Sequence, residues 1–189
     1  MKKRFLGFVA AAVTAAAANA TPLTVCDFEN YPIGTTWTMW HNGSGDIAST
    51  ATVEADPANA SNKVLHIVLK EWGCHPEFEL PTELRGKALT DRYPMVTCDI
   101  YRSGNDADDW KQFAVFIGTQ EVYRDEGYPY QGDKGVWQNR KYTMKAAEEN
   151  NTASVIRLGL HHNNTDYYID NIRPVSYTHL RAHETTLHL

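Results

Sequence analysis

Aromatic side chains that stand beside turn residues are the part of this chain best suited to bind a ligand. Two tryptophans and two tyrosines occur next to or near Asn, Gly or Pro, residues that favour turns. Turns lie at the surface, so these rings are not obviously required to fill a core. An exposed ring can stack on the flat face of a sugar while a few polar groups bind its hydroxyls. The pattern predicts contact with an uncharged, ring-shaped ligand through Trp40, Trp72, Tyr128 and Tyr130.

Polar residues on the outer faces of two predicted strands would complete such a site. Between residues 155 and 161 apolar and polar side chains alternate, so that Arg157 and His161 lie opposite the apolar face. By the same alternation, Tyr101 lies opposite the apolar face of segment 95–101. If the two outer faces form one concave surface, these three residues supply its polar contacts. The alternative is that each lies on an ordinary solvent-exposed face.

The spacing of acids, hydroxyls and metal ligands does not predict a catalytic site. Glycoside hydrolysis needs two carboxylates held about 5–9.5 Å apart. The acidic clusters at 106–109 and 121–126 lack the alternation that would place acids side by side on one strand face, and we expect them in solvated loops. The sequence has no Gly-x-Ser-x-Gly motif for a serine nucleophile, and His161-His162 lacks a third ligand at metal spacing. The pattern therefore favours binding over catalysis.

Short runs of alternating residues predict that β-strands position these side chains. Clusters of Gly, Asn and Asp separate the runs, as at 41–46 and 103–106. Trp37, Trp110 and Trp137 border apolar runs and are expected to be buried. Many short, half-buried strands indicate an all-β sandwich. The expected strands are 23–28, 64–70, 95–101, 113–118, one that includes Tyr142 and Met144, one from Ile156 to Leu160, and 167–172.

Composition indicates a single globular domain with an acidic surface. The 189 residues are 42% hydrophobic and 22% charged, values that exclude a disordered chain, and the length suits one domain with its own core. The formal net charge is -5, and three of the basic residues belong to the first four positions. Because a phosphate backbone attracts basic surfaces, we expect no nucleic-acid partner. We expect the protein to be a monomer.

Residues 1–20 have the form of a secretory signal peptide. Lys2, Lys3 and Arg4 precede an apolar run, and Ala18-Asn19-Ala20 has the small-x-small form that a signal peptidase cleaves. The run is too short to span a bilayer and no second one follows, so we expect a secreted or periplasmic protein without a membrane span. In that oxidising compartment two of the three cysteines can form a disulfide, or all three can be buried as small hydrophobic residues. They are Cys26, Cys74 and Cys98.

The segment from 175 to 189 resembles translated sequencing-adapter DNA. Residues 175–185 read VSYTHLRAHET, which matches one reading frame of the transposon-end adapter used to prepare sequencing libraries. We therefore expect residues 174–189 to be an artefactual, disordered tail, and the natural chain to continue beyond Arg173 into another domain. The alternative is a genuine tail in which His179, His183 and His188 bind a metal.

The two ends of the domain resemble a family of secreted binding modules. The opening Cys26-Asp27-Phe28-Glu29, followed by Gly34 and Trp37, and the closing Tyr167-Tyr168-Ile169-Asp170-Asn171-Ile172 are similar to the first and last strands of jelly-roll, galactose-binding-like carbohydrate-binding modules. Such modules are appended to secreted polysaccharide-degrading enzymes, and their place behind a signal peptide resembles the front end of family-10 endo-1,4-β-xylanases from gut-type Bacteroidetes. The resemblance implies an all-β jelly-roll β-sandwich over residues 21–173 that binds a β-glycan such as xylan without cleaving it. Two alternatives stay open: a small secreted β-sandwich enzyme that cleaves glycans by itself, and a cell-surface adhesion domain.

The resemblance also implies a structural metal. In such modules a calcium ion often ties the first strand to the last, and the matching oxygen donors are Glu29 and Asp170, with backbone carbonyls near Lys63 as additional ligands. The alternative is that both acids are solvated residues at strand ends.

Overall fold

Alternating side chains along most strands bury one face of each of two β-sheets. The computed structural model describes residues 23–41, 49–70, 73–85, 89–108, 110–127, 132–145, 153–161 and 164–176. These residues form ten strands and one helix of a single turn. The elements are β1 (Met39–His41), β2 (Thr50–Asp56), β3 (Asn59–Leu69), β4 (Cys74–Glu79), α1 (Leu89–Arg92), β5 (Met95–Arg102), β6 (Lys111–Ile117), β7 (Gln120–Gly127), β8 (Trp137–Thr143), β9 (Val155–His161) and β10 (Thr165–Val175).

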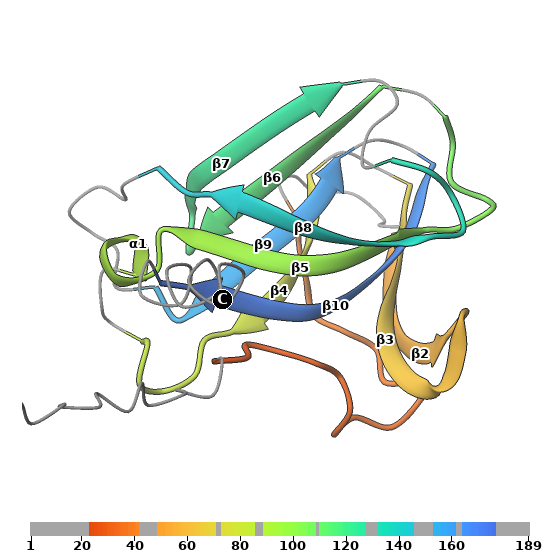
Figure 1. Ribbon diagram of the computed structural model, residues 1–189, viewed down its shortest axis with the longest axis horizontal. Helices are drawn as coiled ribbons and strands as arrows, with labels where there is room; N and C mark the ends of the chain where they lie inside the picture. The colour runs from red at the N-terminus through yellow and green to blue at the C-terminus, as the bar shows by residue number, and fades with distance from the viewer. Residues whose placement is uncertain are drawn as a thin grey trace, which may run out of the picture.

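The strands pair into two antiparallel sheets of five strands each. The first sheet has the order β1-β4-β9-β6-β7, and the second sheet has the order β2-β3-β10-β5-β8. Figure 1 shows them as two layers, with β8, β5 and β10 crossing in front of β6, β9 and β4. The protein is an all-β jelly-roll β-sandwich, which confirms the fold class that the sequence predicts.

Apolar side chains fill the space between the sheets with the predicted period of two. On β3, Leu65, Ile67 and Leu69 are fully buried, whereas His66 is only partly buried and faces outward. Between the layers, the centroids of the Phe113 and Tyr142 rings stack 4.2 Å apart. Each buried apolar side chain of this size stabilises the fold by about 1.5–3 kcal/mol, so the core holds the two sheets together.

The first expected strand, 23–28, is not a strand. Cys26 makes a single antiparallel bridge to Ile172, and Phe28 then takes a left-handed conformation, with a φ of 58°, that turns the chain away. Four strands were not predicted: β1, β2, β4 and β7. In β4 the interior residue Pro76 argues against a strand, and it is accommodated one strand from the sheet edge.

Only one of the three tryptophans expected to be buried packs against the core. Trp37 is half-buried and contacts the core cluster. Trp110 is 39% exposed, and Trp137 is half-buried on the outer face of β8. The expectation is therefore wrong for Trp110 and Trp137, because an apolar run beside a tryptophan does not say which face that tryptophan takes.

The three cysteines are buried and do not form a disulfide. Cys26, Cys74 and Cys98 are all outside any disulfide, so the alternative of three buried small residues is confirmed in this structure. Burial raises the pKa of the Cys26 thiol to about 11 and raises that of Cys98 further above its usual range. Both thiols are therefore held in their unreactive, protonated form.

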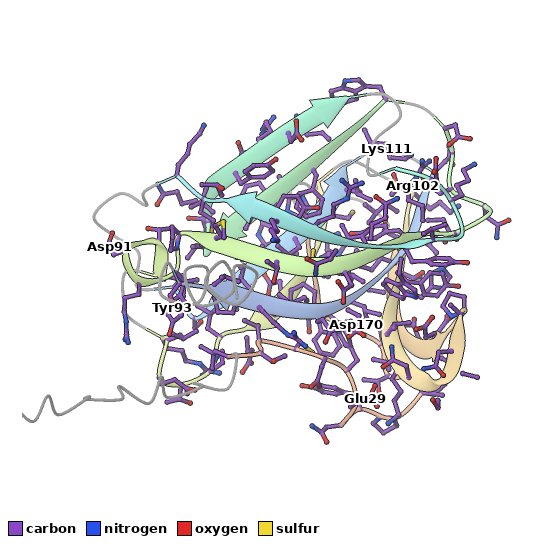
Figure 2. The ribbon with its side chains drawn as sticks, in the orientation of Figure 1. Glu29, Asp91, Tyr93, Arg102, Lys111 and Asp170 are labelled. Atoms are coloured by element: carbon purple, nitrogen blue, oxygen red, sulfur yellow. The ribbon has the colours of Figure 1, made fainter. Side chains whose placement is uncertain are left out.

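A buried ion network closes one end of the sandwich, where β5 ends and β6 begins (Figure 2). Arg102 Nε lies 2.6 Å from Asp106 Oδ2, and Lys111 Nζ lies 3.4 Å from Asp106 Oδ1, with all three side chains almost inaccessible. The backbone N–H of Asp166 donates to Asp106 Oδ1 over 2.9 Å. The expectation of a solvated loop at 106–109 is therefore wrong for Asp106, because two buried cations require its charge.

The last strand runs past the expected end of the natural domain. Pro174 is buried, and Val175 pairs with Met95 of β5. The expected signal peptide and residues 177–189 lie outside the described residues. Within the described part of the chain, no helix has the length and apolar character needed to cross a membrane.

Candidate functional site

A cluster of planar side chains lies on the outer face of the first sheet, the face turned away from the core. The strand register places Trp40 of β1 opposite His75 of β4, and Arg157 of β9 opposite Phe116 of β6. The ring centroids of Trp40 and His75 are 5.3 Å apart, and those of His75 and Phe116 are 4.8 Å apart. The guanidinium carbon of Arg157 lies 4.9 Å from the centroid of the Trp40 ring. We call these four side chains the outer ring cluster.

Arg157 is held in place by an acid and a carbonyl. Its Nε donates to Glu77 Oε1 over 2.7 Å, and its Nη2 lies 2.6 Å from the same oxygen. Its Nη1 donates to the backbone carbonyl of Gly118. A guanidinium with three such contacts has little freedom to move, and its contact with the Trp40 face adds about 0.5–2 kcal/mol. The outer ring cluster is therefore preorganised.

A glycine makes room for the His75 ring. Gly159 of β9 lies opposite Ala114 of β6 in the register. A Cβ atom at position 159 would lie 3.0 Å from His75 Cδ2 and 3.6 Å from the carbonyl oxygen of Cys74. Glycine therefore allows the ring to pack down onto β9, where it is almost fully buried.

The structure brings together two of the seven predicted contact residues and separates a third from them. Trp40 and Arg157 meet in the outer ring cluster. Tyr101 lies on β5 of the second sheet, so the expectation that Tyr101 and Arg157 share one concave face is wrong. The backbone of His161 ends β9, four residues beyond Arg157, and its side chain is not among those that the structure describes. Three predicted contacts lie outside the described residues: Trp72, Tyr128 and Tyr130.

The sequence analysis did not identify two residues of the outer ring cluster and the acid that binds Arg157. Phe116 lies in the continuous run Phe113 to Ile117, where an apolar residue can take either face. His75 and Glu77 lie on β4, which was not predicted. The alternation of Cys74 and Phe78 with these two polar residues is the signal that marks their outer face.

A second row of rings crosses the outer face of the second sheet. The register sets His66, Tyr168, Tyr101 and Trp137 side by side on β3, β10, β5 and β8. Tyr168 stacks on His66 at 4.2 Å, and Tyr101 meets Tyr168 edge-on at 5.8 Å, so these ring faces are largely covered. Trp137 Nε1 donates to Asp56 Oδ1 over 3.0 Å although β2 and β8 are opposite edges of the sheet. The tip of the β2–β3 hairpin therefore curls over this face, and the row anchors it.

Glu29 and Asp170 lie at one corner of the sandwich, on the same side in Figure 2. Two consecutive residues of β3 link them. Asn62 Nδ2 donates to Asp170 Oδ2 over 3.2 Å, and the backbone N–H of Lys63 donates to Glu29 Oε1 over 3.1 Å. The ammonium of Lys63 donates to the backbone carbonyl of Glu29 over 2.7 Å. The first segment of the chain and the last strand thus meet here through β3.

The carboxylate of Asp170 is buried beside other acids. Burial raises its pKa to about 6; hydrogen bonds from Asn62 and from the Asn171 N–H oppose this, while Asp99 and Glu29 add to it. Among the described residues no arginine or lysine contacts this carboxylate, and no three His, Cys, Asp or Glu side chains are arranged to hold a metal. A cation would stabilise the charged form, and calcium accepts amide and backbone oxygens alongside carboxylates.

Comparison with known proteins shows the fold and leaves the family undetermined. No family model matches the sequence, and no curated protein matches it. A cyclase from Fischerella sp. TAU is 17% identical with a TM-score of 0.51, over 80% of this chain and 94% of that chain. The CBM22-1 xylan-binding domain of Paenibacillus barcinonensis Xyn10C is 15% identical with a TM-score of 0.51, over 82% of this chain and 96% of that chain. A structure of carbohydrate-binding modules from the β-sandwich superfamily is 11% identical with a TM-score of 0.50, over 82% of this chain and 62% of that chain.

Proposed function

We propose that this protein binds a β-linked polysaccharide of the xylan type through the outer ring cluster and does not cleave it. The observation that carries the proposal is the position of the cluster. Trp40, His75, Phe116 and Arg157 gather on the side of a sheet that faces away from the core, where filling the core does not require them. The likeness to a xylan-binding domain supports the proposal at the level of the fold.

The chemistry of the cluster suits a neutral, flat ligand. A β-linked pyranose has an apolar face that can contact an indole or phenyl ring and a rim of hydroxyls that can bind polar groups. Trp40 and Phe116 are each half-buried, so part of each ring is accessible to a ligand. The charge of Arg157 is balanced by Glu77, so the cluster has no excess charge that would select an ionic ligand.

Substitution of the accessible ring tests this proposal. Trp40→Ala should weaken binding to soluble xylan by about 1–3 kcal/mol, which is about 5- to 150-fold in Kd, because truncating a central contact ring has effects of this size. Binding is measured by affinity electrophoresis and by calorimetry. Trp110→Ala, which removes a 39% exposed tryptophan outside the cluster, is the matched control and should bind normally. If Trp40→Ala and the control both bind xylan with unchanged affinity, the outer ring cluster is not the xylan-binding site.

We further propose that Glu29 and Asp170 hold a calcium ion. When bound, the ion would neutralise carboxylates that are close to one another and would tie the first segment to β10. The raised pKa of Asp170 and the nearness of Asp99 and Glu29 support a cation at this corner. The Lys63 ammonium already contacts the backbone carbonyl of Glu29. When calcium binds, this ammonium would either move away or remain beside the ion.

We also propose that the mature protein is secreted or periplasmic. The basic start, the short apolar run and the small-x-small site in residues 1–20 support this location. N-terminal sequencing of the protein recovered from the periplasm or medium of a producing cell should begin near Thr21. Recovery of the chain with Met1 in the cytoplasm would contradict the proposal.

A second candidate function is an enzyme that cleaves glycans on the same sandwich, since the same fold also occurs in a cyclase. The two candidates separate in one experiment, in which the purified chain is incubated with xylan and with mixed-linkage β-glucan. A binding module retains the polysaccharide and releases no reducing sugar. Release of reducing sugar that a single Asp or Glu substitution abolishes would place the enzyme first.

A further inference from the structure

A pocket of about 330 Å³ opens between the segment before β1 and strand β4. This segment, red to orange in Figure 1, crosses from the second sheet, where Thr36 bridges Thr52, to the edge of the first sheet. Val25, Phe78 and Val155 contribute apolar surface to the pocket. Its volume is at the lower end of the range for small-molecule sites, which suits a ligand of about one ring.

Two aromatic rings line the pocket, and one is held more firmly than the other. Trp37 is fixed, because its Nε1 donates to the backbone carbonyl of Glu77 over 2.6 Å and its ring meets Phe28 edge-on at 5.2 Å. Tyr31 meets the Trp37 ring edge-on at 4.9 Å and is 41% exposed. A fixed ring beside an exposed one offers an apolar surface that a flat ligand can cover.

Two threonines of the same segment also line the pocket. Thr36 and Thr38 flank Trp37 in the sequence, line the pocket and are exposed. The neighbouring Thr35 hydroxyl already donates to the carbonyl of Pro32 over 2.7 Å. For Thr36 and Thr38, the described part of the chain provides no side-chain hydrogen-bond partner. Each hydroxyl can donate one hydrogen bond and accept others, as a ligand rich in hydroxyls requires.

The acids that line the pocket are already paired. Glu77 Oε1 lies 2.6 Å from Arg157 Nη2, and Glu79 Oε2 lies 2.6 Å from Arg85 Nη2. Their charges are therefore balanced before any ligand binds, so the pocket favours neither an anion nor a cation. We infer that this pocket binds a single neutral polyhydroxylated ring, such as a pyranose, at a site separate from the outer ring cluster.

Glu77 contacts a residue of each site, through its backbone in one and its side chain in the other. Its carbonyl fixes Trp37 in the pocket, and its carboxylate fixes Arg157 in the outer ring cluster. The pocket uses rings and hydroxyls that the cluster does not use, so removal of the Trp40 ring leaves the pocket's own contacts in place.

Amide chemical shifts of the full chain test the inference. Methyl β-D-xylopyranoside should shift the backbone amides of residues 36–38 and the indole N–H of Trp37, whereas choline and acetate should not. Tyr31→Ala and Thr38→Val should each raise the Kd for this sugar roughly three- to tenfold, as expected for loss of one ring contact or one hydrogen bond. Ile33→Ala, which changes a 62% exposed residue of the same segment outside the pocket, should bind normally. Trp40→Ala should also bind the monosaccharide normally.

Three results would overturn the inference. The first is no shift of these amides at sugar concentrations of tens of millimolar. The second is normal sugar affinity in both Tyr31→Ala and Thr38→Val. Both variants should fold, because the Tyr31 side chain is exposed and valine has nearly the shape of threonine. The third is a stronger response to choline or acetate than to the sugar. The two sites can fail separately: unchanged xylan binding in Trp40→Ala would contradict the outer ring cluster alone, and absence of the amide shifts would contradict the pocket alone.

Discussion

The buried carboxylate of Asp170 should make the protein less stable as the pH rises toward neutrality in the absence of calcium. Its pKa is about 6 in the folded protein, against an ordinary value of 3.8 in the unfolded chain. Between these values the folded state binds a proton that the unfolded state has lost, so raising the pH favours unfolding. The stabilising contribution is therefore fully present below about pH 3.8 and is lost as the pH passes through about 6.

The size of the effect follows from the shift in pKa. About two pKa units correspond to about 3 kcal/mol, since one unit is about 1.4 kcal/mol. Asp170 is only 4% exposed, so water does little to screen the penalty. Asp170→Asn cannot ionise, but its amide N–H would face the donating amide of Asn62, which costs about 1 kcal/mol. The variant should therefore exceed the wild type in stability by about 2 kcal/mol at pH 7.5 and should be the less stable protein below pH 4.

Urea denaturation in EDTA between pH 3.5 and pH 8 measures this difference. Using the difference between wild type and variant cancels the contribution of the other acids. Asp91→Asn is the matched control, because Asp91 is an exposed aspartate on α1, away from Asp170 in Figure 2. The difference in free energy of unfolding between Asp91→Asn and the wild type should not grow through the same pH range. Parallel pH profiles of wild type and Asp170→Asn would refute the reasoning.

Three further predictions concern the rest of the molecule. Asp106→Ala leaves two buried cations without their acid and should lower the free energy of unfolding by about 3–5 kcal/mol, measured by chemical denaturation. EDTA should lower the melting temperature of the wild type but not that of Asp170→Ala, measured by calorimetry; equal shifts would contradict the calcium proposal. Gly159→Ala displaces the His75 ring and should weaken xylan binding while lowering the stability by about 1–3 kcal/mol; unchanged xylan affinity would show that the position of His75 is not part of the site.

Alternating residues predicted several of the strands. In β3, β5 and β10 one face packs on the core and the other faces outward, whereas β2 alternates in burial in the same way and was missed. β4 was missed because Pro76 interrupts it, and β1 because it has only three residues. Periodicity depends on the two faces of one strand, so it is informative only where those faces have different environments.

The candidate site was predicted in part, for a related reason. Alternation placed Arg157 and Tyr101 on the outer faces of their own strands, and both placements are correct. It could not say which sheet each strand joins, and β9 and β5 join different sheets. Trp40 and Arg157 meet because β1 and β9 both flank β4, and such long-range pairing leaves no signal in a local pattern.

The three buried cysteine thiols provide a way to follow local opening of the fold without any label. Each lies in a different region: Cys26 in the single bridge to Ile172, Cys74 near the edge of the first sheet, and Cys98 in the interior of the second. A thiol-alkylating reagent reacts with each only when fluctuations expose it, so the masses of modified peptides over time rank the opening free energies of the three regions. Cys26, held by one bridge, is expected to react first, and Cys98 only when the whole domain unfolds. The chain thus contains its own probes for the order in which the sandwich comes apart.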